Sequence, residues 1–223
     1  MSGRDVVLGR VRRALAGTQD GDAAGDTPYE QSVSRDYLRQ HGERTVQETV
    51  DLLAETLADY RAVVHRADGP GLPAVLGRLL AARGARTVLV PPDLPSHWLT
   101  GVEQVPDRAE STPYELDRAD SVVTGCAVAV AETGTIVLDG SPDQGRRRIT
   151  LVPDHHICVV RVPAQVVSSV PQALERLDPA RPLTWISGPS ATSDIELDRV
   201  EGVHGPRTLE VVLVSEEPAA RLA

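Results

Sequence analysis

The sequence contains no lysine and no phenylalanine, and its 23 basic residues are all arginine. The bias is typical of a GC-rich genome, but it also removes whole classes of chemistry. Without lysine there is no Schiff-base lysine, no Walker-A phosphate loop and no lysine general base. The motifs G-x-S-x-G, G-x-G-x-x-G and H-x-x-x-H are missing as well.

Cysteine is scarce too. Cys126 and Cys158 are the two cysteines of the chain, and they form no C-x-x-C motif. This excludes a zinc ribbon or an iron–sulfur cluster built by this chain alone. Cysteines flanked by apolar residues are typically reduced core residues of cytosolic proteins. We therefore expect a cytoplasmic protein with no metal site and no cofactor of its own.

Long apolar runs are also lacking. No stretch approaches the roughly 20 residues that a membrane span needs, and the N-terminus shows no apolar signal-peptide core. The formal net charge of −9 disfavours nucleic acid as a partner. We expect no membrane span and no nucleic-acid binding.

The length predicts one domain, or one domain with an appendage. The chain has 223 residues, of which 41% are hydrophobic. This is enough to form a stable core without disulfide bonds or structural metals. Apolar residues recur with helical period from Asp5 to Ala16, and a polar Gly/Asp-rich linker follows at Gly17–Pro28. We predict an N-terminal helix and flexible linker at 1–42 and an α/β domain at 43–223.

In that domain, apolar strands alternate with helical segments. Such solid apolar runs are typical of a mostly parallel sheet with helices on both faces, a Rossmann-like α/β fold. Periodicity leaves the segment between Thr124 and Thr135 open as helix or strand, and the Pro-rich stretch before Ala119 is expected to be irregular. The predicted helices are Glu43–Tyr60, Gly71–Gly84 and Val166–Leu177, and the strands are Arg61–Ala67, Arg86–Pro91, Ser121–Thr124, Thr135–Leu138, His156–Val162, Leu183–Ser187 and Thr208–Val214.

Ligands in such folds bind beyond the carboxyl ends of strands, and three stretches are candidates. The first is AETGT, Ala131 to Thr135. Glu132 offers a carboxylate for acid–base work, Thr133 and Thr135 offer hydroxyls, and Gly134 permits close backbone approach. A turn capped by its own acidic residue explains the same pattern at least as well.

The second stretch holds Arg146, Arg147 and Arg148, a basic cluster in an acidic protein. Arginines bind carboxylates or phosphates bidentately, although such a cluster is more often a solvated edge. His155 and His156 follow. Adjacent residues of a strand point to opposite faces, so the pair is a poor metal site, and one of the two is readily explained as a satisfied polar residue.

The third stretch runs from Ser187 to Pro206. Ser193 and Glu196 fit a capping box, so a helix is expected to begin there after a loop of small hydroxyl residues, an arrangement that captures anions. The box, however, already satisfies some of the helix N–H groups, and the acidic residues would repel a phosphate. His204 lies in a Gly-bounded turn and is a candidate acid–base or anchoring group.

These stretches in combination resemble the LUD domain, most closely the stand-alone lactate utilization protein C family. The resemblance covers about Glu43 to Val214 and rests on VAETGTIVL, LVPDHHICVV and TSDIE followed by GVHGP. It implies a fold similar to the NagB/RpiA/CoA-transferase group. The matching positions, for which the resemblance assigns no roles, are Glu132, Thr133, Gly134, Thr135, His156, Ser190, Thr192, Asp194, Glu196, His204 and Gly205.

The resemblance implies a role in L-lactate oxidation to pyruvate, with a cysteine-rich partner and an iron–sulfur partner. Because this oxidation needs a redox centre, we expect the Fe–S clusters in the partner subunits and a non-redox role for this chain. One alternative is an autonomous enzyme acting on a phosphorylated, CoA-linked or folate-like substrate, with Glu132 as nucleophile or base. Another is a scaffold without chemistry. The candidate catalytic residues are Glu132 and His204; the candidate ligand-binding residues, for a small organic acid or anion, are Thr133, Gly134, Thr135, Arg147, His156, Ser190, Thr192, Asp194, Glu196 and Gly205.

Overall fold

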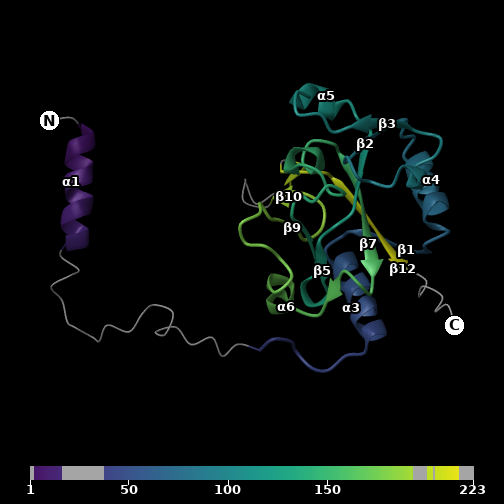
Figure 1. Ribbon diagram of the computed structural model, residues 1–223, viewed down its shortest axis with the longest axis horizontal. Helices are drawn as coiled ribbons and strands as arrows, with labels where there is room; N and C mark the ends of the chain where they lie inside the picture. The colour runs from purple at the N-terminus through teal and green to yellow at the C-terminus, as the bar shows by residue number, and fades with distance from the viewer. Residues whose placement is uncertain (1–2, 17–37, 193–199, 203, 216–223) are drawn as a thin grey trace. The chain divides into compact units, whose positions relative to one another are not determined.

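The computed structural model describes residues 3–16, 38–192, 200–202 and 204–215 (Figure 1). The chain divides into two compact units, Met1–Leu38 and Arg39–Ala223. The described part of the first unit is one helix, α1 (Gly3–Ala16). It confirms the N-terminal helix that the apolar period predicts. The second unit carries all the described strands, which form three sheets.

The centre of the second unit is a six-stranded sheet in which all paired strands are parallel. Its strand order is β1-β12-β7-β4-β2-β3. The longest strands, β7 and β12, lie side by side in register, with His155 opposite Thr208 and Val162 opposite Ser215. The strands are β1 (Val63–Asp68), β2 (Thr87–Val90), β3 (Glu103–Pro106), β4 (Ser121–Thr124), β7 (His155–Val162) and β12 (Thr208–Ser215).

A second sheet of four strands, which the sequence analysis did not predict, has the order β8-β5-β6-β9. Its pairs β5–β6 and β6–β9 are antiparallel, and β5–β8 is parallel. A two-residue pair of strands, β10 (Ala191–Thr192) and β11 (Val200–Glu201), lies apart from both sheets in the pairing. The strands of the second sheet are β5 (Val128–Val130), β6 (Thr135–Leu138), β8 (Val166–Val167) and β9 (Thr184–Ile186).

Different layers cover the two faces of the central sheet (Figure 1). On one face, α4 (Leu72–Ala82) packs its leucines against Val88, Val212 and Val214. On the other face, α3 (Val46–Asp59) and the second sheet enclose a core that includes Cys158, Val160 and Val211. The prediction of a mostly parallel sheet covered on both faces is confirmed, although a sheet shares the covering of one face with helices.

The remaining helices are short. They are α5 (Pro113–Asp117), α6 (Val170–Leu174) and the 3₁₀ turns η1 (Ser96–Trp98), η2 (Ala131–Thr133) and η3 (Arg147–Thr150). Within the described ranges, no helix has the length and apolarity needed to cross a membrane.

Local sequence explains where the two long helices begin and end. A capping box joins Thr45 and Glu48 at the start of α3, whose Leu53 and Leu57 are fully buried. Helix α4 has proline in its first turn, and Gly84 follows its end with φ +65°. That left-handed conformation is the usual way for glycine to terminate a helix.

Two secondary-structure predictions need correction, and a third segment is one that periodicity leaves open as helix or strand. The helix predicted at Val166–Leu177 is only α6, because Val166 and Val167 pair with Ala129 and Val130 as strand β8. The stretch expected to be irregular contains β3, which is paired with β2. The undecided segment between Thr124 and Thr135 is the strand β5 followed by the turn η2.

Candidate functional site

A cavity of about 260 Å³ lies where the second sheet meets the central sheet. Its walls come from the whole of the short strand β9 with the loop after it, from η3, and from the amino ends of β7 and β12. Five of the sequence-predicted residues line it, namely Arg147, His156, Ser190, His204 and Gly205. The site thus lies at the amino edge of the central sheet, whereas the sequence analysis expected ligands beyond the carboxyl ends of its strands.

Backbone hydrogen bonds bring the two ends of the 188–206 stretch together. The Ser190 N–H donates to the Pro206 carbonyl at 2.8 Å, and the Gly202 N–H donates to the Ser190 carbonyl at 3.2 Å. The His204 N–H donates to the Ser190 Oγ at 3.1 Å. Ser190 is therefore the anchor of this wall. Its own hydroxyl hydrogen has no acceptor among the residues that the structure describes.

Two glycines give this wall its path. Gly188 has φ +79°, and a Cβ there would stand 2.1 Å from the Tyr60 carbonyl oxygen at the end of α3. Gly205 has φ +151°, with Ser190 and Leu151 at ordinary contact distance from a Cβ. Of these two glycines, Gly188 is therefore the one required both by its backbone conformation and by the space around it.

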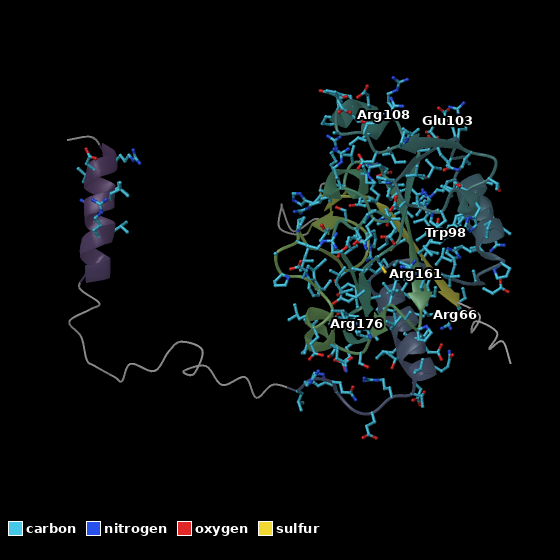
Figure 2. The ribbon with its side chains drawn as sticks, in the orientation of Figure 1. Arg66, Trp98, Glu103, Arg108, Arg161 and Arg176 are labelled. Carbon is cyan, nitrogen blue, oxygen red and sulfur yellow. The ribbon has the colours of Figure 1, made fainter. Side chains whose placement is uncertain are left out.

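The three arginines of the predicted basic cluster have different roles. Arg146 forms a bidentate ion pair with Asp107, whose side chain is 2% exposed. Arg148 donates to the carbonyls of Arg108 and Ala109 (Arg108 is labelled in Figure 2). The exposed Arg147 guanidinium has no hydrogen bond or ion pair with any described residue, and it lines the cavity. One of the three is thus left for a ligand.

We expect Arg146→Gln to lower the free energy of unfolding by roughly 1–3 kcal/mol, because it leaves the buried Asp107 carboxylate without its partner. Arg147→Gln is the matched control and should stay within about 0.5 kcal/mol of the unchanged protein. Urea unfolding followed by circular dichroism measures both. Equal losses in the two variants would contradict the different roles assigned to these neighbours.

The two adjacent histidines point to opposite faces of the sheet, as the strand prediction requires. His156 is 1% exposed, and its Nε2 pairs with the Thr124 Oγ1 at 2.8 Å. Burial, reinforced by the nearby His155, lowers the pKa of His156 to about 3. The His156 imidazole is therefore neutral at physiological pH.

The opposite face holds a buried polar chain that the sequence analysis did not recognise. The Ser121 Oγ pairs with His155 Nδ1 at 2.8 Å, His155 Nε2 with Glu210 at 3.2 Å, and Glu210 with His65 at 2.7 Å. Burial alone would raise the pKa of Glu210, but the hydrogen bonds from His155 and His65 outweigh it and lower that pKa. These hydrogen bonds satisfy polar side chains on four neighbouring strands. The only sign of them in the sequence is a polar residue inside each apolar run.

The AETGT stretch packs mainly under α3. Gly134 has φ +55°, and a Cβ there would lie 2.7 Å from the backbone of Thr56 in α3. The Thr133 hydroxyl donates to the Thr135 hydroxyl at 2.8 Å, and the latter pairs with the Ser187 hydroxyl at 2.8 Å. Because Ser187 lines the cavity, the threonines support its wall from behind.

Glu132 does not line the cavity; it holds the segment before α3. Its carboxylate accepts from the His41 N–H at 2.9 Å and Arg44 at 3.2 Å, and it pairs with the His41 ring at 3.0 Å. Burial raises the pKa of Glu132, but these hydrogen bonds prevail and lower it below its ordinary value. The Glu132 carboxylate therefore anchors the segment that holds His41 and Arg44.

Some predicted site residues cannot be placed. Asp194 and Glu196, with the capping box that begins at Ser193, lie outside the described residues. Thr192 is described only as part of β10. The cavity also has walls that sequence reasoning did not single out, namely Thr150, Leu151, Thr184 and Leu209.

A larger cavity of about 310 Å³ lies between α3 and the β7–β8 connection. Its two arginines are already engaged, Arg44 with Glu132 and Arg176 with the Ala164 carbonyl (Arg176 is labelled in Figure 2). None of the predicted site residues lines it. Chemistry therefore favours the smaller cavity, where a guanidinium and an imidazole nitrogen are unpaired among described residues.

Comparison with known proteins gives consistent matches. Residues 44–214 match the family model of the LUD domain. A protein of Deinococcus radiodurans named lactate utilization protein C is 44% identical over 214 residues, which cover 93% of each chain. A protein of the same name from Bacillus subtilis is 34% identical over 136 residues, covering 57% of this chain and 56% of that protein.

The fold has a solved counterpart. The crystal structure of a DUF162 family protein from Deinococcus radiodurans superposes with a TM-score of 0.68 at 41% sequence identity. The match covers 77% of this chain and 99% of that chain.

Proposed function

This chain belongs to the LUD-domain family, and we propose that it is a non-redox component of a lactate utilization system that converts L-lactate to pyruvate. The observation that carries the proposal is the relative named lactate utilization protein C, which is 44% identical over 93% of both chains. The family-model match over residues 44–214 spans the cavity-forming stretches at 147–156, 184–190 and 204–209, so the similarity is not confined to the core.

The oxidation of lactate removes two electrons, which must pass to a redox centre. Cys126 and Cys158, the two cysteines of the sequence, are both free and buried. The hydrogen bond with Cys158, together with burial, raises the pKa of Cys126 well above its ordinary value, which disfavours the thiolate form that binds metals. We propose that the Fe–S clusters lie in partner subunits, and that this chain works in the cytoplasm with an iron–sulfur partner and a cysteine-rich partner.

Affinity purification of the tagged chain from its native host tests this assignment. We expect cysteine-rich and iron–sulfur proteins to co-purify, and deletion of the gene to abolish growth on L-lactate but not on pyruvate. Restoring the gene in trans is the control. Unimpaired growth on lactate without the gene would refute the proposed function.

A further inference from the structure

We infer that the cavity formed by η3, the 184–190 stretch and the 204–209 stretch binds a 2-hydroxy or 2-oxo monocarboxylate, with the carboxylate on Arg147 and the C2 oxygen on His156. The inference rests on the proposed function only for its physiological setting. The ligand class follows from the groups that line the cavity, and no relative's name assigns a site.

Arg147 supplies the charge. Its neighbours Arg146 and Arg148 are held by Asp107 and by backbone carbonyls, whereas its own guanidinium is unpaired among described residues. It lies on the short turn η3, whose Thr150 Oγ1 donates to the Arg147 carbonyl at 2.9 Å. The guanidinium fork matches the two oxygens of a carboxylate.

His156 supplies a second, independent group. With Nε2 paired to Thr124, the only other polar atom of its ring is Nδ1, which has no partner among described residues. Among the described residues, Arg148 Nε is the one side-chain nitrogen or oxygen that is both fully buried and without a hydrogen-bond partner. His156 Nδ1 also lacks a partner among them but does not belong to that class. Nδ1 is therefore not fully enclosed, and the cavity is the open space that His156 lines.

The neutral imidazole suits an uncharged oxygen. It carries one N–H and one lone pair, and the Thr124 hydroxyl accepts from or donates to Nε2 accordingly. A 2-hydroxyl matches Nδ1 in either tautomer, because it both donates and accepts, and a 2-oxo group matches the tautomer with hydrogen on Nδ1. This requirement separates lactate-like acids from unsubstituted ones.

The charge of the lining favours a monoanion. Among the described lining residues, Arg147 is the only permanent cation and no carboxylate is present. The His156 ring stays neutral down to about pH 3, so it does not add a second positive charge for a phosphate dianion. The volume of about 260 Å³ lies below the roughly 300–1,000 Å³ of sites for drug-sized ligands.

Isothermal titration calorimetry of the full chain with four probes tests the inference. The probes are L-lactate, pyruvate, propionate, which lacks the C2 oxygen, and inorganic phosphate. We expect lactate to bind about 5–10-fold tighter than propionate, as one hydrogen bond predicts, and phosphate to bind more weakly than lactate. Equal binding of lactate and propionate, tighter binding of phosphate, or no binding of lactate overturns it.

Variants connect the binding to the two residues. Arg147→Gln should weaken lactate about 10–100-fold, whereas Arg83→Gln, which removes an exposed arginine at the end of α4, should leave binding unchanged. The double variant His156→Leu/Thr124→Val should bind lactate and propionate alike. If the double variant does not fold, the wild-type probe series and Arg147→Gln still decide, and an Arg147→Gln affinity equal to wild type refutes the site.

The two proposals fail in different ways. Loss of growth on lactate after deletion, with no lactate binding by the isolated chain, leaves the proposed function standing and removes this site. If the isolated chain binds the probes in the expected pattern but the deletion strain still grows on lactate, the site stands and the proposed function is refuted.

Discussion

Gly188→Ala should lower the free energy of unfolding by roughly 2–4 kcal/mol and abolish ligand binding in the cavity. Two effects add. Alanine disfavours the φ of +79° at this position, and its Cβ would stand 2.1 Å from the Tyr60 carbonyl oxygen. Because that oxygen belongs to the end of α3, the cavity wall has to move away from the helix. Urea unfolding and lactate calorimetry measure the two losses.

Gly77→Ala is the matched control. Gly77 lies inside α4, where an added Cβ meets nothing within 4 Å. Alanine is the better helix former by about 0.5–1 kcal/mol, so this variant should be stabilised slightly. A Gly188→Ala protein as stable as Gly77→Ala would show that the close approach to Tyr60 is wrong.

Lowering the pH from 7.5 to 5.0 should cost about 2 kcal/mol of stability through His156 alone. The pKa of His156 falls from 6.5 to about 3 on folding, because the ring is buried. Below pH 6.5 the His156 imidazole is therefore protonated in the unfolded chain but stays neutral in the folded chain until the pH approaches 3. Stability from this group is complete above pH 6.5 and is lost progressively as the pH falls toward 3.

The variant His156→Leu/Thr124→Val removes the titrating ring without leaving the Thr124 hydroxyl unpaired. The difference in unfolding free energy between pH 7.5 and 5.0 should be smaller in this variant by about 2 kcal/mol. Glu210 does not obscure the comparison. Its pKa is lowered, so its contribution is retained at pH 5 and is lost only as the pH falls further. Identical pH dependence in both proteins would contradict a buried, neutral His156.

The apolar runs predicted the central sheet well because each is buried on both faces. Val159 and Val212 face α4 while Val160 and Val211 face α3, so the sequence of both strands is continuously apolar. Strand β3 was missed because it is an edge strand, with Glu103 and Pro106 exposed. Val166 and Val167 form a strand because they pair with β5, a tertiary contact that no local period encodes.

The candidate site was predicted only in part, because contacts between residues far apart in the sequence decide which side chains are available. Sequence placed Arg146–Arg148, His156, Ser190 and His204 among the candidates, but not which arginine would be available. That depends on Asp107 and the carbonyl of Arg108, about 40 residues earlier in the chain. Sequence also did not predict that His41 and Arg44, about 90 residues earlier in the chain, would donate to the Glu132 carboxylate.

The loop from Asp139 to Arg146 has a consequence for how ligands are sought in this fold. The Asp93 N–H donates to the Pro142 carbonyl at 3.1 Å and the Gly125 N–H to the Asp143 carbonyl at 2.9 Å, directly after β2 and β4. The loop is therefore hydrogen-bonded to the segments that follow the neighbouring strands β2 and β4, at the carboxyl edge where open α/β sheets usually hold their ligands. A ligand position transferred by superposition from other α/β enzymes would fall beside this loop, whereas the candidate cavity of this chain lies at the opposite edge of the sheet.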